Sequence, residues 1–462
     1  MPITATIIMI LKKATQISGL HTWPTTITTP CVHHLWAFLL LTVITVKYFI
    51  QRPRTVYLVG YACFGPNSKY RLNITSWFEN IRARLFLDDD SISFLTNISR
   101  RSGLGNETCF PTSFHHVPPI CSLSLAREEA ELIIFTVIDD IFAKTTVKPN
   151  EIDILIVNCS LTTMIPSMTD MIINRYKLRS DIRNMQLSGM GCSAGLVAVG
   201  LARNLLQTMP YGAHALVVST EILTGNYYTG KKRSMQLSNM LFRMGGAAVL
   251  LSTSRANARF ELMHIVRKSQ SAQDSAYRCV FQEEDEEGNL GINLSKDLVA
   301  IAGEALKANI ATIAPLVLPV SEQLSFLLSS IAHKVLKKTA ASTKQYVPNF
   351  GLAVEHFCVH AGGRAVIDAV QRSLNLSDEQ VEPSRMTLHR FGNTSSSSLW
   401  YEMAYCEAKK RIRKGDRVWM IGFGSGYKCN SAVWKCILPA PSADSAWANC
   451  IHRYPMEVPK QV

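Results

Sequence analysis

The chain has 462 residues, of which 47% are hydrophobic and 18% are charged, and its formal net charge is +13. This length favours two or more lobes over one ordinary core, and the composition is that of a folded protein. The positive charge attracts nucleic acid, anionic lipid or phosphate-bearing small molecules. Nucleic acid is the weakest of these three, because the sequence has no zinc-finger spacing, no aromatic-interleaved basic stretch and no long Lys/Arg block.

Twelve cysteines are scattered along the chain without a C-x-x-C pair, so their spacing suits neither a disulfide framework nor a zinc site. We expect most of them to be reduced, buried and small apolar residues, as in a catalytic body kept in a reducing compartment. The acidic run Glu283–Glu287 is predicted to be a solvated loop, and no metal is expected there or elsewhere.

The first predicted element is an apolar helix over residues 35–50, LWAFLLLTVITVKYFI, within an N-terminal segment that we place at 1–51. A helix that crosses the hydrocarbon core needs about 20 residues, so this run is a short transmembrane anchor. Arg52 and Arg54 follow it and place the downstream body in the cytosol. A secretory signal peptide is the alternative interpretation, but no small-residue cleavage site follows the run.

Strand-like and helix-like segments then alternate to the end of the chain, which predicts β-α units and a mostly parallel, buried sheet. The predicted strands are Thr55–Val59, Ile152–Val157, His214–Ser219, Ala247–Leu251, Arg417–Ile421 and Ser431–Ile437. The predicted helices are Ala126–Ala143, Ser193–Gln207, Arg364–Leu374 and Ser395–Arg413. Two similar strand-turn runs, EIDILIVNCS and DRVWMIGFGSG, hint at a duplication, and we place the boundary between halves 52–255 and 256–462 near Ser252–Arg259.

Segment 321–338, SEQLSFLLSSIAHKVLKK, is amphipathic and has a basic end. The favoured interpretation is a partly buried helix of the body. A helix that touches the face of a membrane is the alternative.

The first candidate for chemistry is Asn184–Leu196, NMQLSGMGCSAGL, in which a strand-like run ends at glycines and Cys192 opens a helix of small residues. The positive end of the helix dipole stabilises a thiolate there, and the small neighbours leave room for a substrate. Cys192 is therefore a candidate nucleophile. On this segment alone, a buried structural cysteine in a tight turn remains the favoured interpretation.

The second candidate is EHFCVHAGGR, in which a buried strand ends at His360 and glycines open the next helix. A histidine at that junction can point its ring into a cleft, where neutral imidazole donates from Nε2. His356 lies four residues earlier and could share its face of the strand. The alternative is that both are core histidines hydrogen-bonded by the backbone.

The third candidate is HRFGNTSSSS, in which Asn393 offers an amide N–H that does not titrate and can hold an oxyanion. Asn393 and Thr394 could equally cap a helix beginning near Ser395. A glycine-rich turn, GFGSGYKC, contains Gly424, Ser425 and Gly426 between two strands. Its backbone N–H groups could face a thioester oxygen, or the turn could be a plain hairpin. Together, the cysteine, histidine, asparagine and glycine turn indicate acyl transfer to sulfur followed by carbon-carbon bond formation.

At these residues the sequence resembles the plant 3-ketoacyl-CoA synthases, the condensing enzymes of very-long-chain fatty acid elongation. The resemblance covers about residues 52–440 and rests on RPRTVYLV, RSGLGNET, NCSL, GMGCSAGL, VVSTE, LFRMGGAAVLLS, FCVHAGGRAVID, HRFGNTSSSSLWYE and GFGSGYKCNSAVW. It implies an α/β thiolase-like fold in which two similar halves form five layers, often as a homodimer. It also implies the endoplasmic reticulum membrane as the location, with the body facing the cytosol.

The resemblance implies that Cys192 takes the acyl group from a long-chain acyl-CoA, while His360 and Asn393 hold the thioester oxygen of malonyl-CoA during decarboxylation. The backbone of Cys192 and of the 424–426 turn would hold the oxyanion of the acyl steps. His264, His356 and His389 also match histidines of the family, with additional catalytic roles or structural ones. The implied partners are these two CoA substrates and the reductases and dehydratase of elongation, with no cofactor.

The sequence departs from the family at three places outside the catalytic residues. The first apolar stretch is short and is broken by Lys12–Lys13, Gly60 stands where Asp is usual, and Lys231–Lys232 stand where an Asn-Asp pair is common. These differences concern anchoring, substrate range or expression more than reaction type. Two other functions remain open, a polyketide synthase of the same fold and a membrane scaffold that has lost activity.

Overall fold

The computed structural model describes residues 36–43, 45, 53–72, 76, 79, 82, 88–116, 118–336 and 346–457. Residues Thr55–Val462 form one compact unit, and Met1–Arg54 form a second. In the second unit, residues 36–43 and 45 are helical and exposed. The remainder of the predicted anchor at 35–50 lies outside the described residues.

The strands of the body are β1 Tyr57–Cys63, β2 Ile152–Asn158, β3 Arg183–Leu187, β4 His214–Thr220, β5 Gly246–Ser252, β6 Phe260–Ser269, β7 Val280–Glu284, β8 Leu290–Leu294, β9 His356–Val359, β10 Arg417–Gly424 and β11 Lys428–Cys436. The helices are α4 Asp89–Arg101, α5 Leu123–Lys144, α6 Met168–Tyr176, α7 Ala194–Leu206, α8 Arg233–Leu241, α9 Asp274–Tyr277, α10 Leu298–Val317, α11 Val320–Leu336, α12 Arg364–Leu374, α13 Asp378–Phe391, α14 Ser398–Ala408 and α15 Ser445–Ala448. Two short 3-10 turns, Gly191–Ser193 and Ser395–Ser397, lead directly into α7 and α14.

Within the described residues, the strands form a nine-stranded sheet of order β3-β2-β4-β5-β1-β6-β11-β10-β9 and a separate hairpin, β7–β8. Only the pairs β2–β3, β2–β4 and β9–β10 are parallel, whereas β1–β5, β4–β5, β1–β6, β6–β11 and β10–β11 are antiparallel. The prediction of a mostly parallel sheet is therefore wrong. A turn of three residues joins β10 to β11, and so short a connection permits only antiparallel pairing.

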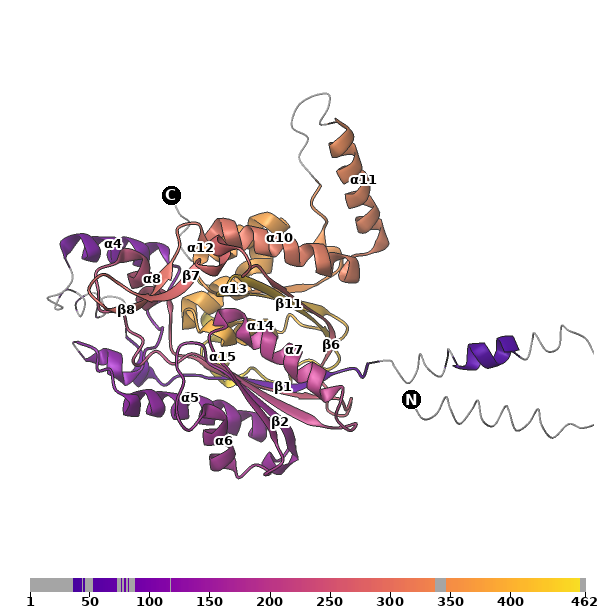
Figure 1. Cartoon of the computed structure of the whole chain (residues 1–462), viewed down its shortest axis with the longest axis horizontal. Coiled ribbons are helices and arrows are strands. Elements are labelled where there is room, and N and C mark those ends of the chain that lie inside the picture. Colours follow the sequence, from indigo (N-terminus) through magenta and orange to yellow (C-terminus); the bar gives the residue numbers. More distant parts are fainter. Residues whose placement is uncertain are drawn as a thin grey trace, which may run out of the picture. The chain divides into compact units, whose positions relative to one another are not determined.

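The body is layered, with helices on both outer faces and two helices in the middle (Figure 1). Helices α5 and α6 pack on β1–β5, and α10, α12 and α13 cover β6, β11 and β9 on the other side. Between them lie α7 and α14. Helix α7 contacts β2 and β4 as well as β6 and β11, and α14 contacts β1 as well as β9 and β10. Three separate hydrophobic clusters fill the spaces between these layers. The boundary predicted near Ser252–Arg259 falls between β5 and β6 and stays a prediction, because residues 55–462 form one unit.

The central helices are buried on nearly every side, which explains their composition. Every residue of α14 from Ser398 to Glu407 is buried, and small residues let α7 approach it closely. A Cβ atom added at Gly195 would lie only 2.4 Å from the carbonyl oxygen of Ser396. The predicted helix Ser395–Arg413 is too long, because α14 ends at Ala408 and Lys410 adopts a positive φ of 55°.

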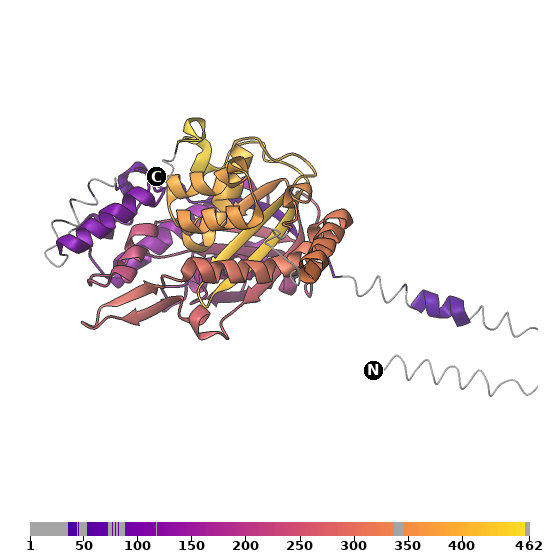
Figure 2. The same cartoon turned by 90° about the horizontal axis from the view of Figure 1, so that it is seen from above.

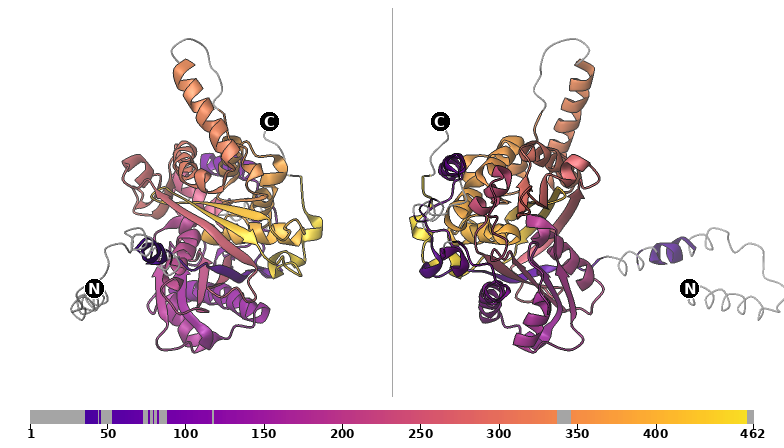
Figure 3. Two further views of the ribbon diagram at one scale, coloured as in Figure 1. Left: turned by 90° about the vertical axis from the view of Figure 1, so that its right-hand side faces the viewer. Right: turned by 60° about the vertical axis from the view of Figure 1, so that its left-hand side comes forward.

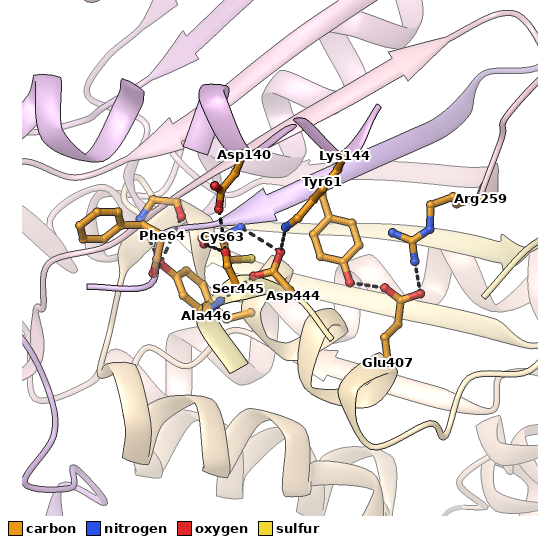
Figure 4. Close-up of polar contacts among 12 residues, drawn as sticks. Tyr61, Cys63, Phe64, Asp140, Lys144, Arg259, Glu407, Asp444, Ser445 and Ala446 are labelled. Carbon is orange, nitrogen blue, oxygen red and sulfur yellow. Dashed lines mark hydrogen bonds and ion pairs between the residues drawn. The ribbon is translucent and has the colours of Figure 1, made fainter. Parts of the chain in front are cut away.

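A buried polar network fastens β1 to the C-terminal part of the chain (Figure 4). Glu407, at the end of α14, accepts hydrogen bonds from the hydroxyl of Tyr61 and the guanidinium of Arg259. Asp444 binds Lys144 at 2.6 Å and caps α15 through the backbone N–H of Ala446. Because each buried carboxylate has a cationic partner, the network joins distant segments without leaving an unpaired charge.

Two elements project from the layered body. Hairpin β7–β8 extends at one edge (Figure 2), and its acidic residues Glu283 and Glu284 end β7, so the predicted solvated loop is confined to the turn after them. Lys232 pairs with Glu283 at 2.9 Å, which gives this departure from the family a local partner. Gly60 is another position at which the sequence departs from the family. A Cβ atom added there would lie 3.1 Å from the methyl carbon of Thr145.

Helix α11 also stands away from the body (Figure 3). Its apolar residues Val320, Leu324, Phe326, Leu327, Leu328 and Ile331 are all exposed. The expectation of a partly buried helix is therefore wrong for its apolar face. Within the described residues, one helix, α10, is long and apolar enough to cross a membrane by length and composition alone. It packs on β6 and β11, which makes it a helix of the body in this fold.

Candidate active site

A cavity of about 750 Å³ brings together Cys192, His360 and Asn393. Most of its remaining wall is apolar and comes from α8, the β7–β8 hairpin and the first residues of α10 and α12. The glycine turn at 424–426 completes the lining. The three predicted catalytic residues, which lie up to 201 positions apart in the chain, thus share one pocket.

Cys192 lies in the 3-10 turn immediately before α7 and is half-buried. Gly191 has a φ of +68°, and a Cβ atom there would lie 2.5 Å from the backbone nitrogen of Ser425. Glycine therefore allows both the sharp turn and the close approach of the 424–426 turn to the nucleophile. The backbone N–H of Gly191 donates to the hydroxyl of Ser160 at 2.9 Å, which fixes the turn from its other side.

The thiol of Cys192 is not poised as a thiolate in this resting arrangement. Burial is the main cause that raises its pKa, and nearby Glu221 adds to the rise, while Ser395 and Asn393 partly offset it; together these influences place the pKa at about 12. The expectation that the helix start would favour the thiolate is therefore corrected. Burial outweighs the hydrogen bonds that favour the charged form.

The side chain of Asn393 makes two hydrogen bonds at the cavity wall. Its Oδ1 accepts the backbone N–H of Ser395 at 2.8 Å, in the turn before α14. Thr394 occupies the N-cap position of this turn and makes no side-chain cap hydrogen bond, so the predicted cap by both residues is wrong for Thr394. The Nδ2 of Asn393 donates to the carbonyl oxygen of Gly362 at 3.2 Å. These two hydrogen bonds fix the orientation of the amide, and its role as an oxyanion donor stays a prediction.

His360 follows β9 and is held in place by backbone and side-chain contacts. Its backbone N–H donates to the backbone carbonyl of Ile421 at 2.9 Å, and its ring nitrogen Nδ1 lies 2.7 Å from the hydroxyl oxygen of Ser398. The side chain is almost fully buried, and burial lowers its pKa to about 4. The imidazole is therefore neutral at physiological pH and has one N–H to donate.

The glycine turn is fastened at several points against the nucleophile. Lys428 donates from Nζ to the carbonyl of Ser425 at 2.6 Å, and the hydroxyl of Ser271 donates to the carbonyl of Gly426. A Cβ atom at Gly424 would lie 2.4 Å from the hydroxyl oxygen of Ser193. The turn is a hairpin between β10 and β11 and it also lines the cavity, while the contact of its backbone N–H groups with a thioester oxygen stays a prediction.

The three further histidines lie outside the cavity lining. His356 begins β9 and its Nε2 lies 3.0 Å from a carboxylate oxygen of Asp416. Although it shares a strand face with His360, four residues of strand separate them by about 13 Å. His389 lies in α13 with Nδ1 3.4 Å from the hydroxyl of Tyr454, and His264 pairs with Val433 in the sheet.

Three residues of the site, Glu221, Ser395 and Ser398, were not predicted from the sequence. Buried Glu221 accepts hydrogen bonds from the backbone of Ser160 and Leu161 and from the hydroxyl of Ser395. Burial raises its pKa. The sequence signal for Glu221 was a carboxylate at the end of the buried strand VVSTE. Ser398 was one of four serines in a row, so the sequence did not distinguish it from its neighbours.

A sequence profile described as FAE1/Type III polyketide synthase-like protein matches residues 48–335, and one described as 3-oxoacyl-[acyl-carrier-protein (ACP)] synthase III C terminal matches residues 352–436. 3-Ketoacyl-CoA synthase 5 of Arabidopsis thaliana is 54% identical over 436 residues, which are 93% of this chain and 88% of that protein. The chain belongs to the 3-ketoacyl-CoA synthase family. A further Arabidopsis thaliana member, 3-ketoacyl-CoA synthase 6, is 55% identical over 91% of this chain and 84% of its own length. The predicted family and the predicted class of enzyme, a condensing acyltransferase, are confirmed.

Solved structures confirm the thiolase-like fold of this 3-ketoacyl-CoA synthase family member. CsyB complexed with CoA-SH superposes with a TM-score of 0.64 at 21% identity and covers 82% of this chain and 100% of its own. The type III polyketide synthase 1,3,6,8-tetrahydroxynaphthalene synthase of Streptomyces coelicolor A3(2) gives 0.63 at 19% identity, covering 83% of this chain and 100% of its own. At these identities the comparison concerns the fold alone.

The described cysteines are free thiols, and all but Cys121 and Cys192 are buried, as expected from their spacing. In the same part of the chain, no group of three or more His, Cys, Asp or Glu side chains could hold a metal ion.

Proposed function

We propose that this chain condenses malonyl-CoA with a long-chain acyl-CoA to give 3-oxoacyl-CoA, CO2 and CoA, the first step of very-long-chain fatty acid elongation. The observation that carries this proposal is the single cavity lined by Cys192, His360 and Asn393. A thiol nucleophile can hold the acyl group there, and two neutral N–H donors can hold an enolate. The naming of the most similar relatives as 3-ketoacyl-CoA synthases supports the same reaction.

In the loading step, the sulfur of Cys192 attacks the thioester carbonyl of the acyl-CoA. A carbon-sulfur bond to Cys192 forms, the bond to the CoA sulfur breaks, and the thiol proton leaves with CoA. The transient oxyanion would be held by the backbone N–H groups of Cys192 and the 424–426 turn, which approaches the nucleophile closely at Gly191.

In the second step, malonyl-CoA loses CO2, and the electron pair of the broken bond forms an enolate. The N–H groups of His360 and Asn393 stabilise this oxygen more strongly as an enolate than as a ground-state carbonyl. The enolate carbon then attacks the acyl carbonyl on Cys192, and the tetrahedral intermediate expels the sulfur. The products are 3-oxoacyl-CoA and the Cys192 thiolate, which takes one proton from water to regenerate the thiol, and no cofactor is required.

Purified enzyme incubated with labelled malonyl-CoA and saturated C16 to C24 acyl-CoAs tests this proposal. One round of condensation to 3-oxoacyl-CoA is the expected result. Repeated condensation to cyclised products would support a polyketide synthase instead. Neither product from a folded enzyme would favour a scaffold that has lost activity.

We further propose that the enzyme resides at the endoplasmic reticulum membrane with its body in the cytosol. The apolar run at 35–50 supports this placement, and the side chains described at 36–43 are exposed. Helix α11 adds a second apolar surface, because Val320, Leu324, Leu327 and Ile331 recur at helical spacing and are exposed. The sequence after them supplies lysines at 334, 337 and 338, which suit anionic headgroups.

Photoactivatable phospholipids in microsomes that contain the full chain test both surfaces. Label on peptides from 35–50 and from α11 is the expected result. Leu324→Asp with Leu327→Asp should remove the label from α11 alone, whereas Leu438→Asp, another exposed leucine, should not. Label confined to the N-terminal segment would contradict a membrane role for α11.

The remaining proposals concern assembly. We propose that the chain forms a homodimer, as its resemblance to the family implies. We also propose that it works beside the elongation reductases and dehydratase, because 3-oxoacyl-CoA must be reduced, dehydrated and reduced again before another round. Crosslinking of the full chain in microsomes tests both contacts. Nucleic acid is not proposed as a partner, and turnover that persists after chelation would support a reaction without metal.

A further inference from the structure

The contact between His360 and Ser398 raises a question about which ring nitrogen carries the proton. Both side chains are buried, and His360 Nδ1 lies 2.7 Å from Ser398 Oγ. A neutral imidazole has a single N–H, and the partner of one nitrogen decides whether the other is a donor or an acceptor. Oxyanion stabilisation requires that the nitrogen facing the substrate be the donor.

Nε2 is the nitrogen on the side of the reacting groups. A Cβ atom added at Gly362 would lie 2.9 Å from Nε2 of His360. The carbonyl oxygen of the same Gly362 accepts the amide Nδ2 of Asn393 at 3.2 Å. Both donors are therefore adjacent to one glycine, which itself lines the cavity with them.

The hydroxyl of Ser398 has one hydrogen and two neighbouring acceptors. Its oxygen lies 2.7 Å from His360 Nδ1 and 3.1 Å from the carbonyl oxygen of Ser395. That carbonyl already accepts the backbone N–H of Ser398, so it does not depend on the hydroxyl. The shorter distance and the satisfied carbonyl both direct the hydroxyl hydrogen toward Nδ1.

We propose that Ser398 is a positioning residue that donates its hydroxyl hydrogen to His360 Nδ1 and thereby fixes the imidazole with its proton on Nε2. This inference rests on the proposed condensation, for which it supplies the orientation of one of the two enolate donors. With the hydroxyl removed, the ring can place its proton on Nδ1. Nε2 then presents a lone pair, which repels the enolate oxygen.

Ser398→Ala tests the proposal, with Ser397→Ala as a matched control. Ser397 is buried in the adjacent turn, and its hydroxyl donates to the carbonyl of Thr394 at 2.8 Å. Ser398→Ala should lower kcat for decarboxylation of malonyl-CoA by about 10- to 100-fold and leave KM nearly unchanged. Ser397→Ala should stay within about twofold of the wild-type enzyme, because its hydroxyl does not contact His360.

Alkylation of Cys192 by iodoacetamide separates this effect from a general collapse of the site. The alkylation rate should be the same in Ser398→Ala and wild type, because the hydroxyl has no contact with the thiol. Ser398→Thr, which keeps a hydroxyl, should recover most of the lost kcat. A fall in both alkylation and decarboxylation, or an equal loss in Ser397→Ala, would overturn the positioning role in favour of a structural one.

Nitrogen-15 spectra of histidine-labelled enzyme give a readout that does not need turnover, with the His360 signals assigned by their loss in His360→Gln. The wild type should show a protonated Nε2 and a bare Nδ1, and Ser398→Ala should show both tautomers. A wild-type ring protonated on Nδ1 would refute the proposal even in an active enzyme. A wild-type enzyme with no condensing activity but the expected spectrum would instead refute the proposed function and leave the tautomer assignment intact.

Discussion

The two central helices begin in the same way and supply opposite kinds of chemistry. Each starts with a 3-10 turn that faces the same cavity, Gly191–Ser193 before α7 and Ser395–Ser397 before α14. The first presents Cys192, which is the nucleophile in the proposed mechanism. The second is preceded by Asn393, which is a neutral donor to the enolate in that mechanism. One type of helix start thus supplies both the proposed acyl carrier and a proposed enolate donor.

Burial favours the uncharged form of the titratable groups at the cavity. It raises the pKa of the Cys192 thiol and of the Glu221 carboxyl, and it lowers the pKa of the His360 imidazole. Each shift favours the uncharged form. The resting cavity therefore favours neutral groups, and charge develops when a thioester or a malonyl carboxylate enters. Variants that alter one helix start at a time can test whether the two starts have these separate roles.

The largest expected effect is that of Cys192→Ala. Condensation should fall by at least ~10⁴-fold, because the acyl group loses its only covalent attachment in the mechanism. Decarboxylation of malonyl-CoA should persist, because His360 and Asn393 remain. Measurement of 3-oxoacyl-CoA and CO2 in parallel checks this, and Cys450→Ala, a buried cysteine away from the cavity lining, should keep both activities. Residual condensation near the wild-type rate would refute the nucleophile.

The next largest effect is expected at the second helix start. Asn393→Ala should lower the rate of decarboxylation by about 10²- to 10³-fold, because one enolate donor is lost. Asn393→Asp keeps the oxygen that caps Ser395 but cannot donate when ionised. It should therefore lose as much activity while keeping the hydrogen bond from Ser395, which is worth about 1 kcal/mol of stability. An active Asn393→Asp enzyme would show that the cap, and not the donor, matters.

The close contact between the start of α7 and the turn before α14 predicts that a larger residue at this contact lowers the stability of the fold. Gly195→Ala should lower the free energy of unfolding by about 3 kcal/mol, because the new methyl group would lie 2.4 Å from the carbonyl oxygen of Ser396. Gly200→Ala, in the same helix, would meet the end of the Ile265 side chain at 3.3 Å and the Arg267 side chain at 3.8 Å, and should cost much less because both side chains can move. Denaturant unfolding of both variants checks this. Equal losses would indicate helix composition and not the contact between the helices.

Much of this site could be predicted from the residues around it. Cys192, His360 and Asn393 each stand beside glycines at the end of a strand or the start of a helix, and that pattern is local. Glu221 and Ser398 could not be found in this way, because their roles depend on neighbours distant in the sequence, Ser160 and His360. A run of four serines gives no indication of which hydroxyl reaches the imidazole.

The fold shows the same division between local and long-range information. The predicted strand and helix segments were visible as apolar runs, and helix Arg364–Leu374 agrees at both ends with α12, but β6, α10 and α13 were not predicted. Strand direction was not visible, because pairing depends on connections and partners outside the strand. The exposed apolar face of α11 was likewise hidden, since an amphipathic pattern shows that one face is apolar but not what that face contacts.

The smallest expected effect concerns pH and follows from the neutral state of the cavity. The pKa of His360 is about 4 in the folded chain, against an ordinary value near 6.5 in the unfolded chain. As the pH falls below 6.5, the unfolded state takes up a proton that the folded state refuses until about pH 4. The stability held by this residue is therefore complete above pH 6.5 and is lost as the pH falls through that window.

Between pH 7 and pH 5, His360 should account for a loss of about 2 kcal/mol in the free energy of unfolding. His360→Gln removes the titrating group, so its stability should fall less over the same range, and the difference between the two pH-dependent losses isolates this residue. His452→Gln, which replaces an exposed histidine, is the matched control. If His360→Gln loses as much stability as the wild type, the imidazole is not buried in its neutral form. The second helix start would then face a charged partner and not a neutral donor.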